Sequence, residues 1–235
     1  MAYIGLIPCR RGSERVVNKN TRPFGGFEGG LLELKLRQMS GVLELERIIV
    51  SSNDPLVLDY TAGFAARHDP RFEAVPRPDH LGSSATTMDE YILYAADLCR
   101  EGTLVWTHVT SPFIRGVHYS AAIAAYERAL TDGHDSLVSV TRLQKFIWDQ
   151  DGPVNYDPTV LRWPRSQDLR PLFEINHAVY IMPFALMRER QDRVGRKPFF
   201  HETAEHDALD IDWDEQFHFL DRLMRFRRAE GEALL

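Results

Sequence analysis

Short apolar runs rich in β-branched residues alternate with helix-like stretches along most of the chain, and this alternation restricts its fold more than any other feature. The runs occupy residues 3–8, 47–51, 72–75, 103–108, 136–140 and 177–182. Several of them, including IGLIP and RIIVSS, are almost continuously apolar, as expected for parallel strands that are buried on both faces. The sequence therefore predicts a single α/β domain over residues 1–235, with helices on both sides of a mainly parallel sheet.

Two segments depart from this alternation. Residues 144–173 contain Asp151-Gly152, several prolines and no sustained period, so we expect an excursion from the core that packs against another surface. Residues 213–235 instead predict an amphipathic closing helix. Its apolar residues at helical spacing are Phe217, Leu220, Leu223 and Met224.

Charge and composition exclude several classes of partner. The net charge is −6 and the pI is near 5.8, so there is no general basic field to attract a nucleic acid. No apolar run approaches the roughly 20 residues of a membrane span. The two cysteines, Cys9 and Cys99, are too few for a disulfide scaffold and lack the CxxC spacing of a zinc site. We expect a cytoplasmic protein with neither a membrane nor a nucleic acid as its partner.

A cluster of cations follows the first apolar run. Residues 7–20, IPCRRGSERVVNKN, place Arg10, Arg15 and Lys19 at one predicted strand end, where ligands of this sheet class bind. Backbone amides near Gly12 and Ser13 can form an anion-binding nest, and arginine forks bind phosphate oxygens. This pattern favours a triphosphate site, and its alternative is a solvated basic loop. The spacing fits neither a Walker A loop nor a dinucleotide fingerprint.

Two carboxylates near the C-terminus form a candidate metal site. Asp210 and Asp212 flank Ile211, so on an extended strand both carboxylates share one face while the isoleucine enters the core. Mg²⁺ binds to proteins through one or two carboxylates together with substrate phosphates. The alternative is that Asp212 or Asp214 only caps the helix that follows.

The motifs along the chain also resemble, in order, those of a known family. IPCRRGSERVVNKN is similar to the opening signature of the CMP-sugar synthetases, IPARGGSKxxPxKN in acylneuraminate cytidylyltransferases. The later blocks, each with its family counterpart, are RPDHLGSSATTMDEY at 77–91 (RPxxLAxDxAxxxD), THVTSPFIR at 107–115 (QPTSPLR), RSQDL at 165–169 (TQDL), INHAVYI at 175–181 (ENGAxYI) and LDIDWDEQF at 209–217 (SIDIDTEEDF). Six ordered blocks over nearly the whole chain make chance a poor explanation.

This resemblance implies a nucleotide-diphospho-sugar transferase fold and transfer of CMP from CTP to an acidic sugar, with release of pyrophosphate and Mg²⁺ as cofactor. It implies that Arg10, Arg15, Lys19 and Asp212 are catalytic and that Asp210 and Asp212 bind the metal. It places the nucleotide on Arg10, Gly12, Ser13, Lys19, Asn20, Arg77 and Thr87, the last three near the cytidine. Glu14 stands where sialate enzymes more often have lysine, and the block at 77–91 is one residue short.

The resemblance also implies an acceptor site and a dimer. The acceptor site would include His108, Arg165, Gln167, Asn176 and His177, and the excursion at 144–173 would reach a second subunit of a homodimer. His108 and His177 replace the glutamine and glycine of many family members, and the alternative is that both are structural histidines. The sequence leaves two alternative functions. The chain could be a cytidylyltransferase whose acceptor is a polyol phosphate or a phosphonate, or it could be a non-catalytic module that binds nucleotide sugars.

Overall fold

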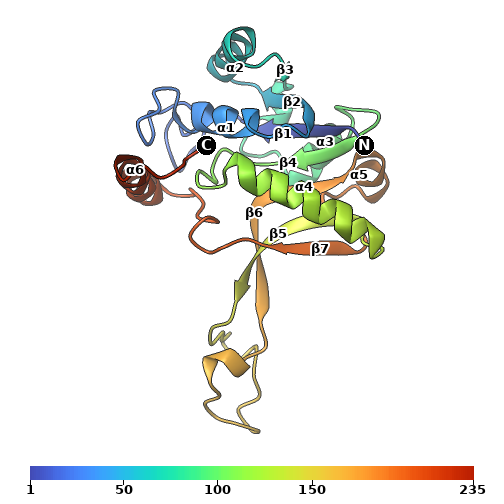
Figure 1. Ribbon diagram of the computed structural model, residues 1–235, viewed down its shortest axis with the longest axis vertical. Coiled ribbons are helices and arrows are strands. Elements are labelled where there is room, and N and C mark those ends of the chain that lie inside the picture. The colour runs from blue at the N-terminus through green and yellow to red at the C-terminus, as the bar shows by residue number, and fades with distance from the viewer.

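The computed structural model describes residues 1–235 and contains one seven-stranded sheet with helices on both faces (Figure 1). The strands are β1 (Tyr3–Pro8), β2 (Leu45–Ser52), β3 (Phe72–Pro76), β4 (Thr103–Trp106), β5 (Ser136–Leu143), β6 (Leu172–Pro183) and β7 (Pro198–Glu202). Their order is β3-β2-β1-β4-β6-β5-β7. Only β6 runs antiparallel to its neighbours, β4 and β5. The predicted α/β domain with a mainly parallel sheet is therefore confirmed.

Alternating side chains explain why β1 lies inside the sheet. Tyr3 and Ile7 enter the hydrophobic cluster on one face, whereas Ile4 and Leu6 enter the cluster on the other. All four are at most 5% exposed. A strand buried on both faces needs apolar residues at every position, which is why this run reads as continuously hydrophobic.

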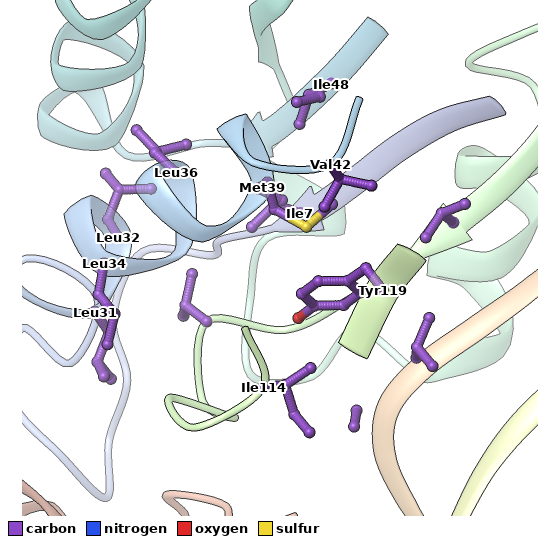
Figure 2. Packing of buried hydrophobic residues seen from close by; sticks show 14 of the residues in the cluster. Ile7, Leu31, Leu32, Leu34, Leu36, Met39, Val42, Ile48, Ile114 and Tyr119 are labelled. Atoms are coloured by element: carbon purple, nitrogen blue, oxygen red, sulfur yellow. The ribbon is translucent and has the colours of Figure 1, made fainter. Parts of the chain in front are cut away.

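The helices divide between the two faces. One face is covered by α1 (Gly30–Ser40), α2 (Pro55–Arg67), α4 (Gly116–Thr131) and α6 (Asp214–Ala229), and the other by α3 (Met88–Ala96) and α5 (Phe184–Arg190). Figure 2 shows leucines of α1 gathered with Ile7 of β1, Ile48 of β2 and Tyr119 of α4. This packing fixes α1 between the loop that follows β1 and the start of α4.

Helix α6 closes the first face, as the sequence predicts. Phe217, Leu220 and Met224 are buried in the cluster, and Leu223 packs against it while partly exposed. The ring of Phe217 meets Phe24 edge-on at a centroid distance of 5.3 Å. The N-terminus of α6 therefore has a fixed position beside the loop after β1. No helix of the chain combines the length and the apolar character that crossing a membrane requires.

Three features of the sheet differ from the sequence-based expectation. Strand β7 was not predicted, because PFFHE is short and half polar; it forms an edge strand parallel to β5, and its Phe200 stays 45% exposed. Strand β6 begins five residues earlier than the apolar run at 177–182, since its first part belongs to the excursion. Residues 209–212 are not a strand, because Ile211 makes only a single backbone bond, from its N–H to the Thr110 carbonyl (3.0 Å).

The predicted excursion projects from the body of the molecule on the extended ends of β5 and β6 (Figure 1). Asn155, almost fully buried, holds it together: its side chain accepts from the N–H of Ile147 and donates to the carbonyls of Lys145 and Arg170. Phe146 packs edge-on against Trp163. The excursion thus has its own internal structure, although it has no share in the main core.

Candidate active site

A pocket of about 620 Å³ opens at the carboxyl ends of β1 and β4. Its lining comes from three parts of the chain. The loop after β1 contributes Arg10, Ser13, Glu14, Arg15, Lys19 and Asn20, and the region from β3 to α3 contributes Arg77, Ser83, Ser84, Thr86, Thr87 and Tyr91. Later segments contribute Trp106, His108 and Thr110 around the end of β4, His177 of β6, Arg193 between α5 and β7, and Asp210 and Asp212 before α6. The sheet thus brings together residues that are up to about two hundred positions apart, at the edge where this class of sheet binds ligands.

Two cations join the loop after β1 to the segment before α6. The ammonium of Lys19 donates to the carbonyl of Ile211 at 3.0 Å. The guanidinium of Arg15 pairs with Asp212 at 3.0 Å and lies over the ring of Trp213. Burial lowers the pKa of Lys19, and the nearby carboxylates of Asp210 and Asp212 oppose that shift. The positive charge of the pocket is therefore held directly beside its carboxylates.

Backbone contacts shape the rest of this loop. Gly12 adopts a left-handed conformation with φ of +72°, which allows the turn that carries Ser13 to the pocket wall. The amide of Asn20 donates to the carbonyl of Arg10 at 3.1 Å, and the Arg11 N–H donates to Asn53 at 2.9 Å. The sequence predicts an anion-binding nest at Gly12 and Ser13. Of these two residues, only Ser13 lines the pocket.

Asp210 and Asp212 both face the pocket although they are not on a strand. Ile211 between them is fully buried, so the predicted alternation holds. Burial raises the pKa of Asp210, and Asp212 raises it further, while Thr110, Ser111 and Lys19 act in the opposite direction. Two converging carboxylates in a cationic pocket suit Mg²⁺, which takes its remaining oxygen ligands from phosphates and water. No group of three or more His, Cys, Asp or Glu side chains forms a closed metal site.

The alternative that Asp212 or Asp214 caps α6 does not fit the contacts. Trp213 is the N-cap residue of α6. The side chain of Gln216 accepts from the backbone N–H groups of both Asp212 and Trp213, at 2.8 and 2.9 Å. Asp214 pairs with Arg22 at 2.8 Å. The carboxylates of Asp212 and Asp214 are therefore paired with arginines and make no capping hydrogen bond to α6.

The three residues expected near the cytidine all reach the pocket. Arg77 is 7% exposed; its guanidinium donates to the Ser51 carbonyl at 2.7 Å and stacks on Tyr91 at 4.0 Å. The Thr87 hydroxyl caps α3, because it accepts from the N–H of Glu90. Asn20 already donates to a backbone carbonyl. Arg77 thus forms a rigid wall of the pocket, although arginine side chains are mostly exposed on protein surfaces.

The acceptor residues expected from the sequence are only partly brought together. His108 and His177 line the pocket. Asn176 does not, because its buried amide is bonded to Ser139 and Thr141 within the sheet. Arg165 and Gln167 lie on the excursion, where Arg165 is 74% exposed and pairs with Asp168 at 2.8 Å. Within one chain, Asn176, Arg165 and Gln167 are therefore outside the pocket.

Arg193 is a pocket residue that the sequence analysis missed. It lies in the segment between α5 and β7, and its guanidinium stacks on Trp106 and Tyr180 with centroid distances of 5.3 and 4.3 Å. It also contacts His108 and His177. The sequence around it, RERQDRVGRK, contains five basic residues and gives no local signal that distinguishes this one.

A buried lysine supports the site from the core. Lys35 of α1 is fully buried, and its ammonium donates to the carbonyls of Ser111 and Ile114 and to the hydroxyl of Tyr119. Ser111 in turn donates to Asp210 at 3.3 Å. Burial lowers the pKa of Lys35 to about 7, and Asp210 opposes this shift. Lys35 thereby fixes the turn after β4 against which Asp210 rests.

A mainly parallel α/β sandwich with a cation-rich pocket and a carboxylate pair at its strand ends is the arrangement of a nucleotidyltransferase. A family model described as cytidylyltransferase matches residues 4–232, so the chain belongs to the cytidylyltransferase family and is a CTP-dependent nucleotidyltransferase. The resemblance to the CMP-sugar synthetases is confirmed at this level. Among curated protein sequences, none matches the chain significantly.

Solved structures share the fold at low sequence identity. A CMP:2-keto-3-deoxy-manno-octonic acid synthetase complexed with CTP superposes with a TM-score of 0.70 at 12% identity, covering 98% of this chain and all of the other. A 4-diphosphocytidyl-2C-methyl-D-erythritol synthase from Anaerococcus prevotii gives 0.66 at 14%, covering 95% of this chain and 98% of the other. The bifunctional IspDF from Campylobacter jejuni gives 0.62 at 13%, covering 94% and 55% respectively.

Replacing Lys35 with methionine tests the buried charge. The ordinary lysine pKa is 10.5 and the folded value is about 7. Between these values the unfolded chain binds more protons than the folded chain, so this group makes stability rise with pH. Urea unfolding from about pH 7 to about pH 10 should show the wild type gaining stability relative to Lys35→Met. Lys197→Met, which removes an exposed lysine, is the control. Parallel pH profiles for wild type and Lys35→Met would contradict this account.

Proposed function

We propose that this cytidylyltransferase transfers CMP from CTP to an acidic sugar, a 2-keto sugar acid such as a sialic-acid-like compound. The observation that carries the proposal is the charge of one pocket, whose lining includes five cationic side chains and three carboxylates. Arg10, Arg15 and Lys19 lie in the loop after β1 and suit the triphosphate. Arg193 lies in a different segment and leaves a cation for a second anion, which an acidic acceptor supplies.

The reaction consistent with this pocket is in-line attack of a sugar hydroxyl on the α-phosphorus of CTP, with pyrophosphate leaving. The chain's own residues contribute position and charge rather than a covalent intermediate. Arg10, Arg15 and Lys19 offset negative charge on the phosphates, and Ser13 adds a polar group beside them. Asp210 and Asp212 would hold Mg²⁺, which when bound neutralises phosphate charge and polarises the α-phosphate.

A polyol phosphate is the second candidate acceptor. The fold matches the 4-diphosphocytidyl-2C-methyl-D-erythritol synthase over 98% of that chain, with a TM-score close to that of the CMP-sugar enzyme. Both types of acceptor carry an anion, so the charge of the pocket alone does not separate them. Membership of the cytidylyltransferase family argues against the remaining alternative, a non-catalytic nucleotide-sugar binding module.

An acceptor panel tests the proposal directly. Pyrophosphate release is measured with CTP and Mg²⁺ in the presence of nonulosonic and other 2-keto sugar acids, their neutral parent sugars, polyol phosphates and phosphonates. We expect turnover with one or more sugar acids and background rates with the other three groups. Turnover confined to a polyol phosphate or a phosphonate would replace the proposed acceptor with that class.

Replacing Asp210 or Asp212 with alanine should reduce turnover by about 100-fold or more, because each removes a proposed ligand of the metal. Stability should change little, since Asp210 is destabilised by burial and Asp212 makes a half-exposed ion pair of small net energy. Asp214→Ala, two positions further along, is the matched control. Near-normal Mg²⁺-dependent pyrophosphate release by both variants would disprove the metal assignment.

We also propose that two chains form a homodimer in which the excursion at 144–173 contacts the partner and carries Arg165 and Gln167 toward the partner's acceptor pocket. Support comes from apolar side chains that the excursion leaves uncovered: Trp148, Leu161 and Trp163 are 56%, 55% and 66% exposed.

Sedimentation at micromolar concentration should give the mass of two chains. Leu161→Asp should shift the protein toward monomer, whereas Leu43→Asp, which changes an equally apolar but 85% exposed residue on the body, should not. A wild-type protein that sediments as a monomer would contradict the proposed dimer.

A further inference from the structure

Arg193 is a pocket cation whose direct side-chain partners are all neutral. Its guanidinium lies 3.4 Å from Nε2 of His108 and 3.3 Å from Nδ1 of His177, and the hydroxyl of Tyr180 is also close. The other four pocket cations are occupied differently: Arg15 pairs with Asp212, Arg10 and Lys19 donate to backbone carbonyls, and Arg77 donates to Ser51. Arg193 therefore forms no ion pair in the pocket: burial lowers its pKa and the adjacent Asp192 opposes that fall, but Asp192 lies outside the pocket lining and accepts from the N–H of Val194.

The contacts of Arg193 fix the protonation of both histidines. A guanidinium can only donate hydrogen bonds, so Nε2 of His108 and Nδ1 of His177 must accept them. The indole N–H of Trp106 also donates to Nε2 of His108, at 3.1 Å. Both imidazoles are consequently neutral, and each keeps its one N–H on the other ring nitrogen. Burial and the charge of Arg193 lower the pKa of both rings, in agreement with this assignment.

This corner of the pocket therefore offers donors and no free charged acceptor. The guanidinium has further N–H groups beyond those that reach the imidazoles. Its plane is fixed by stacking on Trp106 and Tyr180, which reduces the entropy lost when a planar anion binds to its edge. A ligand that satisfies this corner must bring acceptor oxygens and a negative charge, and a carboxylate matches the planar fork.

We propose that Arg193 binds the carboxylate of the acceptor and thereby selects acidic sugars over neutral ones, with His108 and His177 as the residues that position its guanidinium. This inference rests on the proposed function and names the group that recognises the acid. It also gives the two histidines a role, because a neutral imidazole on each side orients the fork without competing for its charge.

The test compares Arg193→Gln and Arg193→Lys with wild type in steady-state kinetics, using the sugar acid that the acceptor panel identifies. Arg193→Gln should raise the KM for the acid by about 100-fold and change the KM for CTP by less than about threefold. Arg193→Lys keeps the positive charge but loses the planar guanidinium, so its KM for the acid should lie between those of wild type and Arg193→Gln. Arg196→Gln is the matched control, because Arg196 lies in the same segment, outside the pocket, and pairs with Glu189.

The carboxamide of the same sugar separates a carboxylate contact from general damage to the pocket. Wild type should use the carboxamide poorly, and Arg193→Gln should use it no worse than wild type does. Thermal unfolding confirms that the variants fold. An unchanged KM for the acid in Arg193→Gln, or an equal rise in the KM for CTP, would overturn the assignment.

The experiment distinguishes a failure of the proposed function from a failure of this inference alone. If wild type turns over only a polyol phosphate, the acidic-sugar proposal fails, and the same variants are then measured with that substrate. A rise in its KM in Arg193→Gln would show that Arg193 binds a phosphate, which also overturns the carboxylate assignment. If wild type uses the sugar acid and Arg193→Gln behaves as wild type, only the inference about Arg193 is wrong.

Discussion

The contact between the loop after β1 and the segment before α6 is the interaction on which the rest of the site depends. Lys19 donates to the Ile211 carbonyl, Arg15 pairs with Asp212, and the buried Ile211 side chain anchors the segment in the core. An exposed ion pair alone contributes at most about 1 kcal/mol. The partly buried lysine and the buried isoleucine therefore account for most of this attachment, while the charges set the electrostatics of the pocket.

Burial and the neighbouring charge of Asp212 explain why Asp210 needs support from the core. Both raise the pKa of Asp210, burial most of all, and so raise the cost of keeping its carboxylate ionised. The charge of Lys19 offsets part of that cost. The buried ammonium of Lys35 holds the turn at residues 111–114, whose Ser111 donates to Asp210. The loop lysine thus stabilises this carboxylate by its charge, and the core lysine does so by fixing a hydrogen-bond donor to it.

Much of this arrangement could be predicted from the sequence, because its signals are local. Continuous apolar runs identified six of the seven strands, and the spacing of Phe217, Leu220 and Met224 identified the closing helix. The basic loop directly follows β1 and the paired aspartates directly precede α6. They meet because Ile211 is buried in the core and its backbone bonds to Thr110 and Lys19. The edge strand β7 was missed because an edge position needs few apolar residues.

Residues whose roles depend on three-dimensional neighbours could not be predicted. Arg193 stands among several basic residues, and only the fold places it between Trp106 and Tyr180. Asn176 was expected to bind the acceptor, whereas the pairing of β5 and β6 turns its amide toward Ser139 and Thr141. Lys35 reads as one polar residue in a helix, and its burial appears only when α1 packs against the turn after β4.

The central claim is that one pocket binds CTP, with its phosphates on the cationic loop and its base near Arg77 and Thr87. Nucleotide selectivity tests this claim most directly, because such a pocket should accept only one base. A site whose polar groups pair with cytosine leaves some of them unpaired with other bases. Pyrophosphate release should be measured with CTP, UTP and ATP at equal Mg²⁺ concentrations and with the same acceptor. We predict a kcat/KM for CTP at least about 100-fold above the values for UTP and ATP. Equal turnover of CTP and UTP would contradict the account.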